Sequence, residues 1–499
     1  MILQERVKLL LFVLLSISLN SFSTNTKFYN ISDTYGITSG EAFSICKDQY
    51  GFIWTSTKTG ILRVTEGDCR NYELPCRTTD FVFVKLTYSN SQLFSYTNNG
   101  QIFHYDEPTD QFFFLTDLRE ETDNSHITIG TIVADTSNVL WIASSIGLFK
   151  YENNILTKIP QTEEDIKHLT FYDDNHLFYI TSAGISLLNI STSESRLLYS
   201  NTTEDFFQVP SLYYDDQLKR LWIGTGSAGL FYYDIIRKSL SDIPIRNFPK
   251  QPILAIRKDA KNTLLIGIDG QGIWNISEKG DTIFHIYKED LNNPFSLRGD
   301  GVYDILCDGS KNWIATFTGK LSFFENNNSQ ITPVTYQINN PNSLGNNYVN
   351  QIIEDHEGHI WFATNNGVSC WDAASNKWKH YYQNKSEQAK VFLSLCEDNQ
   401  GHIWAGSYSS GIYLLDRETG KTLKHYSSKT NTPGFTGDFI FDFFVDKEGD
   451  VWIGGNQKLS CYLIKEDRFR EYPVQPVSAF AELSPGKLLL TTSRGLLLL

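Results

Sequence analysis

The sequence predicts an all-β fold built from repeated four-stranded sheets, and three observations support this prediction. Aromatic residues make up 14% of the 499 residues, glycine occurs 34 times and methionine once. This composition suits pleated sheet better than helix bundles. A motif of the form Asp-x-x-Gly-x-Ile-Trp recurs along the chain. The motif continues as Ile-Trp-Ile-Gly-Thr, which alternates bulky and small residues with the period of two that β-strands have.

Copies of the motif cover nearly the whole chain. The clearest copies place tryptophan at four positions, Trp54, Trp361, Trp404 and Trp452. Weaker copies place the equivalent residue at Phe94, Trp141, Phe178, Trp222, Leu265, Trp313 and Leu489. The eleven copies recur about every 43 residues, a period typical of repeat architectures.

Each part of one repeat has a structural role. The aspartate can accept a hydrogen bond from its own backbone two residues on, and the glycine supplies the left-handed conformation that closes a hairpin. One strand precedes this turn, as at 349–353, and the tryptophan strand follows it. A second glycine opens the next hairpin, and an aromatic strand such as 378–382 ends the unit. Four short antiparallel strands in about 40–50 residues predict the blade of a β-propeller. A solenoid is the lesser alternative, because its coils are usually shorter.

Eleven blades exceed the 4–8 that usually close one ring, so we divide them into seven and four. Residues 27–331 are expected to form a seven-bladed β-propeller, closed by an early strand at 27–30 that pairs into the last blade. Residues 332–499 then hold the first four blades of a second β-propeller, which stops in mid-strand at Leu499. Such a partial ring would expose strand edges and apolar blade faces. The sequence is therefore expected to be a truncated piece of a longer protein or a broken reading frame.

The first 23 residues have the pattern of a signal peptide. Arg6 and Lys8 precede an apolar stretch at 9–19, and small polar residues follow it. The stretch is too short to span a bilayer comfortably, and the sequence has no other of spanning length. We expect an exported, periplasmic protein without a membrane span in this chain. The net charge of −14 argues against nucleic acid as a partner.

Cysteine, histidine and carboxylate patterns do not predict a catalytic or metal site. The seven cysteines contain no CxxC and no Cys/His metal spacing, so neither a metal nor another cofactor is expected. Export permits disulfides, and Cys69 with Cys76 could close a small loop. The GxGxxG at 224–229 lies inside a repeat and is interpreted as a glycine-rich hairpin rather than a dinucleotide site. No catalytic residue is assigned.

Blade geometry indicates where a ligand would bind. The loop between the second and third strands shares a face with the connection to the next blade, whereas the Asp-x-x-Gly turn lies on the opposite face. The first of these faces varies between repeats and offers aromatic and amide side chains, which suit the apolar C–H faces and hydroxyls of sugars. The candidate ligand-binding residues on this face are Lys58, Asp269, Gln271, Phe317, Asn365, Asn366, Tyr408 and Asn456.

The repeats resemble the two-component regulator propeller repeats of hybrid two-component sensors that control polysaccharide utilisation. The resemblance covers residues 27–499 and includes the entry segment 35–39 and the Asn-Pro-x-Ser-Leu linkers. It implies a signal peptide and two seven-bladed periplasmic propellers. An immunoglobulin-like domain, a membrane helix, a histidine kinase and usually a receiver with a DNA-binding domain would follow. Everything after the eleventh blade is missing from this sequence, so no kinase and no other enzyme activity is expected.

The resemblance therefore implies a periplasmic sensing module. It would bind an oligosaccharide and relay the signal to downstream domains that this chain lacks, and a homodimer through the sensor region is compatible with this role. Two alternatives stay open: a propeller-fold polysaccharide lyase or hydrolase, and a propeller that binds another protein.

Overall fold

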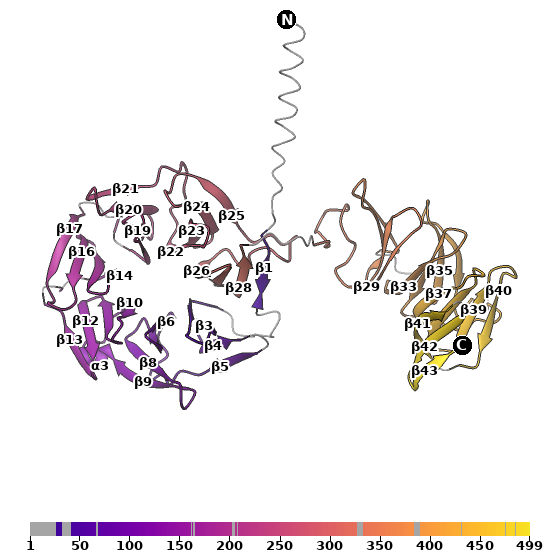
Figure 1. Cartoon of the computed structure of the whole chain (residues 1–499), viewed down its shortest axis with the longest axis horizontal. Coiled ribbons are helices and arrows are strands. Elements are labelled where there is room, and N and C mark those ends of the chain that lie inside the picture. The colour runs from indigo at the N-terminus through magenta and orange to yellow at the C-terminus, as the bar shows by residue number, and fades with distance from the viewer. Residues whose placement is uncertain are drawn as a thin grey trace, which may run out of the picture. The chain divides into compact units, whose positions relative to one another are not determined.

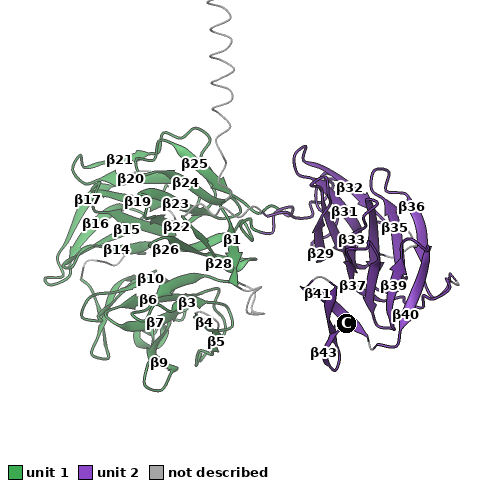
Figure 2. Cartoon of the chain, turned by 45° about the vertical axis from the view of Figure 1, so that its right-hand side comes forward, with its two compact units in different colours: residues 1–290, 295–330 green, residues 291–294, 331–499 purple. Residues whose placement is uncertain are grey.

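The computed structural model describes residues 26–499 except 32–40, 66–67, 161, 163–164, 202–204, 207, 327–332, 384–389, 431, 475 and 485. The predicted signal peptide at 1–23 and the predicted domain break at 331/332 lie outside the described residues. The chain divides into two compact units. Unit 1 comprises residues 1–290 and 295–330, and unit 2 comprises 291–294 and 331–499 (Figure 2).

Unit 1 contains seven four-stranded antiparallel sheets, which we call blades 1 to 7. Blade 1 consists of β2 (Ser44–Lys47), β3 (Ile53–Ser56), β4 (Ile61–Val64) and β5 (Cys69–Tyr72). Blade 2 consists of β6 (Val84–Ser89), β7 (Gln92–Thr97), β8 (Gln101–Asp106) and β9 (Gln111–Asp117). Blade 3 consists of β10 (Ile129–Ala134), β11 (Leu140–Ser144), β12 (Gly147–Glu152) and β13 (Ile155–Lys158). A short helix, α3 (Leu118–Thr122), follows β9.

Blades 4 to 7 continue the same order. They are β14 (His168–Asp173), β15 (His176–Thr181), β16 (Gly184–Asn189), β17 (Ser195–Ser200); β18 (Ser211–Asp215), β19 (Arg220–Gly224), β20 (Leu230–Asp234), β21 (Ser239–Asp242); β22 (Ile253–Lys258), β23 (Thr263–Ile268), β24 (Gly272–Ser277), β25 (Ile283–Tyr287); and β26 (Val302–Asp308), β27 (Lys311–Thr316), β28 (Lys320–Glu325), β1 (Phe28–Asn30). The first strand of each of blades 1 to 7 contacts the first strand of the next, and β26 contacts β2, so the seven blades form a closed ring (Figure 1).

Unit 2 contains blades 8 to 11. They are β29 (Val349–Glu354), β30 (Ile360–Thr364), β31 (Gly367–Asp372), β32 (Lys377–Tyr381); β33 (Phe392–Glu397), β34 (His402–Ser407), β35 (Ile412–Asp416), β36 (Thr422–Tyr426); β37 (Ile440–Val445), β38 (Val451–Gly455), β39 (Leu459–Leu463), β40 (Arg468–Tyr472); and β41 (Val477–Ser484), β42 (Lys487–Thr492), β43 (Gly495–Leu498). The all-β propeller prediction and the count of eleven blades are confirmed. In the described part of the chain, blade 11 has three strands, as expected for a last repeat that stops at Leu499.

The N-terminal strand closes the ring of unit 1. β1 pairs antiparallel with β28, with Phe28 opposite Phe324 and Asn30 opposite Ser322. Phe28 is 3% exposed, and its ring lies 5.0 Å from that of Phe324. The strand predicted at residues 27–30 therefore completes blade 7. The other three strands of this blade, β26 to β28, come from the C-terminal end of the unit's sequence.

The aspartate, glycine and tryptophan that recur in the repeat are joined in one turn. In blade 1, Oδ1 of Asp48 accepts hydrogen bonds from the backbone N–H groups of Tyr50 and Phe52, at 3.0 and 2.9 Å. Gly51 adopts a φ of +89°, which favours glycine. Oδ2 of Asp48 accepts the indole N–H of Trp54 at 2.7 Å. The same aspartate–indole bond recurs in four further pairs: Asp135–Trp141, Asp355–Trp361, Asp398–Trp404 and Asp446–Trp452.

The hydrophobic core lies between neighbouring blades rather than inside any one of them. Between blades 1 and 2, for example, Trp54 and Tyr72 pack against Leu86, Phe103 and Phe112. Because each sheet has two covered faces, the bulky residues of its second strand are buried; Trp54 is 1% exposed. Burial of this kind contributes about 25 cal/mol per Å² of apolar area, so each blade depends on its neighbours for stability.

The disulfide that Cys69 and Cys76 could have formed is absent. All seven cysteines are free thiols. Cys69 packs against the cluster between blades 7 and 1, whereas Cys76 packs against the cluster between blades 1 and 2. The two side chains therefore cover opposite faces of blade 1 and act as small apolar residues.

The interpretation of residues 224–229 as a hairpin is confirmed. β19 ends at Gly224 and β20 begins at Leu230. Both the backbone N–H and the hydroxyl of Thr225 donate to the carbonyl oxygen of Gly229, at 3.2 and 2.8 Å.

Candidate ligand-binding site

A cavity of about 670 Å³ opens on unit 1 where the innermost strands of its blades begin. In six blades, the residue directly before the innermost strand lines it: Phe43, Phe83, Thr128, Lys167, Pro210 and Pro252. Blade 7 contributes Tyr303. Loops between second and third strands contribute Asn98, Ser145 and Asp269. The blade-to-blade connections and these loops therefore share one face, and all seven blades contribute to one cavity.

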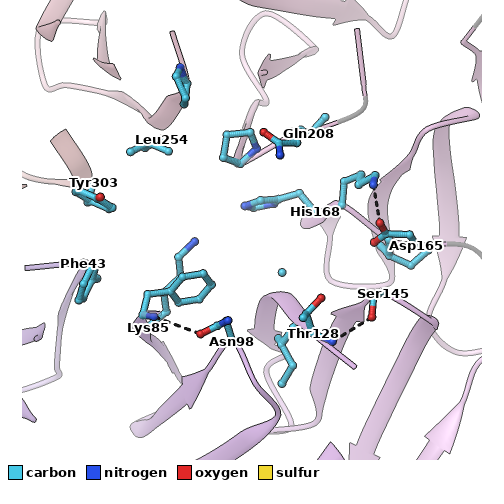
Figure 3. Close-up of a pocket in the computed structure, with 18 of the residues that line it drawn as sticks. Phe43, Lys85, Asn98, Thr128, Ser145, Asp165, His168, Gln208, Leu254 and Tyr303 are labelled. Carbon is cyan, nitrogen blue, oxygen red and sulfur yellow. Dashed lines mark hydrogen bonds and ion pairs between the residues drawn. The ribbon is translucent and has the colours of Figure 1, made fainter. Parts of the chain in front are cut away.

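A second space of about 360 Å³ extends along the innermost strands. It shares Lys85, His168 and Tyr303 with the first cavity. Lys85 lies on β6 and His168 begins β14, so both project from the strands that surround the centre of the ring. Figure 3 shows the side chains of Lys85, His168 and Tyr303 directed toward a common space.

His168 is a neutral imidazole in this cavity. Its Nδ1 lies 3.0 Å from the carbonyl oxygen of Leu169, which requires Nδ1 to carry the proton. Burial, followed by the charge of Lys85, lowers the pKa of His168 to about 3. Nε2 is then an unprotonated acceptor, suited to the hydroxyl of a ligand.

Lys85 supplies a positive charge to the same cavity. Burial lowers the pKa of the Lys85 ammonium, while the nearby Asp304 carboxylate acts in the opposite direction. The ammonium nitrogen lies 5.1 Å from the ring centre of Phe83, a cation–π distance. Among the described residues, no carboxylate lies within 4 Å of this nitrogen.

The Asp304 carboxylate is fully engaged in the wall of the ring. Its Oδ2 accepts the backbone N–H of Ile45 at 2.9 Å and the hydroxyl of Ser44 at 3.3 Å. Its Oδ1 accepts from the Arg257 guanidinium at 3.2 Å and from its neighbour Ile305. Asp304 thus joins blade 7 to blades 1 and 6, and it neutralises Arg257.

The rim of the cavity combines a paired and an unpaired carboxylate. Lys167 donates to Asp165 at 2.5 Å, so these two charges cancel (Figure 3). Asp269 lies in the exposed loop between β23 and β24, and its backbone N–H donates to the carbonyl of Pro252. Its carboxylate is available to accept hydrogen bonds from a ligand.

Aromatic rings and amides surround these charges. The ring of Tyr303 lies edge-on to Phe43 at 5.4 Å and 6.0 Å from Phe317, which is 46% exposed. Asn98 accepts two backbone N–H groups through its Oδ1, from Val82 at 2.7 Å and Phe83 at 3.3 Å. Its amide nitrogen is thereby oriented as a donor.

The structure places the sequence-predicted residues in different environments. Asp269 lines the cavity, and Phe317 reaches it through Tyr303. Gln271 follows in the same loop as Asp269 and accepts from Lys288 at 2.9 Å. Lys58 lies exposed in the β3–β4 loop and does not line the cavity.

The other four predicted residues belong to unit 2, so they are not part of this cavity. Asn365 accepts from Asn350 at 3.0 Å, and Asn366 donates its backbone N–H to Thr364. The ring of Tyr408 packs edge-on to that of Phe439 at 4.8 Å. The backbone N–H of Asn456 donates to the carbonyl oxygen of Phe439. Tyr408 and Asn456 therefore meet at Phe439, on successive blades.

Asp269 is the one predicted residue that lines the cavity, and the polar lining residues not predicted from the sequence include Lys85, His168, Tyr303 and Gln208. None of them belongs to the repeated motif. The available signal was a polar residue at the start of a first strand, as in Val84-Lys85-Leu86, where an apolar strand lines the ring. Within the described ranges, no cluster of three or more histidine, cysteine, aspartate or glutamate residues could hold a metal ion. In the same part of the chain, no helix has the length and apolar character needed to cross a membrane.

Comparisons with known proteins agree with this architecture. The family model described as two component regulator propeller matches residues 343–366, 386–409 and 434–457. Each match includes the first two strands of one of blades 8 to 10 and the turn between them. These segments are two component regulator propeller repeats. None of the curated proteins matches the chain at a significant level.

Among solved structures, the chain is similar to the extracellular domain of a protein described as a hybrid two component system of B. thetaiotaomicron. The two are 16% identical with a TM-score of 0.50, over 93% of this chain and 76% of that one. A second such domain from B. thetaiotaomicron is 18% identical with a TM-score of 0.49, over 95% and 73%. Virginiamycin B lyase from Staphylococcus aureus is 13% identical with a TM-score of 0.48, over 60% and 99%. At 16% identity, the similarity to the first of these structures shows a shared fold and nothing further.

Proposed function

We propose that the chain is a periplasmic sensing module that binds an oligosaccharide at the cavity of unit 1. Three of its repeats, in blades 8 to 10, match the two component regulator propeller model, and a similar fold forms the extracellular domain of a hybrid two component system. The observation that carries the proposal is a single cavity to which all seven blades contribute. A ligand in this cavity would contact several blades at once, and binding would be passed to signalling domains through these contacts.

The chemistry of the cavity supports a sugar ligand. Rings of Phe43, Phe83 and Tyr303 offer apolar surface for the C–H faces of a sugar. Asn98, Gln208 and the acceptor nitrogen of His168 offer partners for hydroxyl groups. The volume lies within the range of about 300–1,000 Å³ that is usual for small-molecule sites.

The domain organisation is part of the proposal. Residues 1–23 would be the signal peptide, 27–331 a seven-bladed propeller and 332–499 blades of a second propeller. Limited proteolysis is expected to make its first cut between Glu325, which ends β28, and Val349, which begins β29. First cuts inside blades 1 to 7 would contradict this division.

The ligand proposal is tested by isothermal titration of the chain against a panel of oligosaccharides. A binder should lose affinity in Gln208→Ala, because this exposed side chain lines the cavity. Gln271→Ala is the matched control, since it removes the same amide from the same face but outside the cavity. Absence of binding by every sugar, or equal loss in both variants, would refute binding at this site.

A further inference from the structure

The cations that line the two connected spaces are Lys85, Lys167 and Arg257. Lys167 is paired with Asp165 at 2.5 Å, and Arg257 with Asp304 at 3.2 Å. Lys85 has no ion pair among the described residues. The lining also holds three carboxylates, Asp165, Asp269 and Asp304, so its formal charges balance. Among the described residues, however, the Lys85 ammonium on an inner strand and the Asp269 carboxylate at the rim have no ion-pair partner.

The surroundings of Lys85 do not neutralise it. The nearby Asp304 carboxylate already receives four hydrogen bonds, from Ser44, Ile45, Arg257 and Ile305. His168 is neutral and donates to a backbone carbonyl, so it adds no charge. Asp269 lies on blade 6 in an exposed loop, whereas Lys85 lies on an inner strand of blade 2. A half-buried ammonium without a counterion is unfavourable, and an anionic group entering the cavity would relieve that penalty.

We infer that the ligand of this cavity is an acidic oligosaccharide whose carboxylate or sulfate group binds the ammonium of Lys85. The inference rests on the proposed function and specifies its ligand class. In this arrangement the rings of Phe83 and Tyr303 contact the sugar face, and Nε2 of His168 accepts a hydroxyl. The exposed carboxylate of Asp269 stands at the rim, where it accepts further hydroxyls and orients the anionic end inward.

The test is a glycan array that carries neutral, uronate-bearing and sulfated oligosaccharides, probed with the full chain. Each acidic binder is then titrated beside its own neutral counterpart, carboxyl-reduced for a uronate or desulfated for a sulfate ester. We expect the acidic member of each pair to bind about ten- to a hundredfold more tightly, because hydrogen bonds to charged groups are the stronger ones. The preference should shrink as salt is raised. The uronate and sulfate arms distinguish the two anions.

Variants locate the effect. Lys85→Met should abolish the preference for the acidic member, and Lys85→Arg should retain most of it. Lys58→Met is the matched control, because it removes the same charge from an exposed loop of the same face outside the cavity. Near-ultraviolet circular dichroism shows whether each variant is folded, and the comparison of paired ligands on the unaltered chain does not depend on any variant.

The outcomes separate the inference from the function on which it rests. If the array selects neutral sugars, or if acidic and neutral partners bind equally, the acidic-ligand inference is wrong while oligosaccharide sensing stands. If Lys58→Met reduces binding as much as Lys85→Met, the anion is held by the general field of the surface and not by this site. If no sugar of either kind binds, the proposed function fails and the inference fails with it.

Discussion

The Trp54 indole donates its N–H to the Asp48 carboxylate at 2.7 Å, across the turn between β2 and β3. The bond fixes a buried aromatic ring to the residue that also organises the turn. Five blades of the chain contain this pair. Trp222 shows what happens without it: Asp216 has the same spacing but pairs with Lys219, and the Trp222 indole N–H has no partner among the described residues.

Removal of this carboxylate is expected to destabilise blade 1. Asp48→Ala leaves a buried indole N–H without an acceptor, which should lower the free energy of unfolding by about 1–3 kcal/mol. Urea unfolding measures the change. Asp216→Ala is the matched control and should change the free energy of unfolding by less than about 0.5 kcal/mol. Equal losses in the two variants would show that the hydrogen bonds that Asp48 accepts from the turn and from the indole contribute little to the stability of the blade.

Closure of the ring through β1 should contribute strongly to the stability of unit 1. Phe28→Ala removes a ring that is 3% exposed and is expected to lower the free energy of unfolding by about 3–5 kcal/mol. The neighbouring Tyr29 is 37% exposed and stacks on Phe323, so Tyr29→Ala should lower it by about 1 kcal/mol. Chemical denaturation of both variants gives the comparison. A small effect of Phe28→Ala would mean that the ring is stable without its closing strand.

Stability is expected to fall as the pH is lowered through the range in which an ordinary histidine gains its proton. The folded pKa of His168 is about 3, below the ordinary value of 6.5, so the unfolded chain binds this proton first. The free energy of unfolding is therefore highest above pH 6.5 and decreases toward pH 3. Between pH 7 and pH 5 the decrease should reach about 2 kcal/mol. Urea unfolding across this range measures it, and His168→Gln should flatten the profile. An unchanged slope in that variant would assign the effect to other groups.

The seven thiols are expected to be free but slow to react in the folded protein. Burial raises the pKa of Cys69, of Cys76 and, to about 12, of Cys307, so the reactive thiolate is scarce at neutral pH. Ellman's reagent should find seven thiols in the unreduced, denatured chain and react much more slowly with the native one. A count of five in the denatured chain would indicate one disulfide.

The fold was predictable because its rules are local. An aspartate, a glycine and a tryptophan within seven residues define the turn, and the strand alternation on either side follows from it. The aspartate–indole bond was not foreseen, although the constant spacing of Asp48 and Trp54 contains it. The three strands of blade 11 agree with a last motif copy, at Leu489, that is followed by ten residues.

The candidate site was only partly predictable for the opposite reason. The face on which the cavity opens followed from blade geometry, and Asp269 lies at the cavity. Lys85 and His168 lie on different blades, and only closure of the ring brings them together. The spacing of residues within one repeat does not show which side chains of different blades come close together. The predicted residues were therefore taken from the loops between second and third strands. Of these, Lys58 is exposed to solvent and Gln271 accepts a hydrogen bond from Lys288.

The pairing of β1 with β28 also has a kinetic consequence. Most contacts in unit 1 join residues within one blade or in adjacent blades, and these can form as soon as a hairpin is complete. Phe28 and Phe324 stand near opposite ends of the unit, so their pairing needs the largest loop closure in it. During synthesis Phe28 emerges early, and its partner Phe324 is made only with the last blade. Until then the ring is open and the cavity has no complete wall.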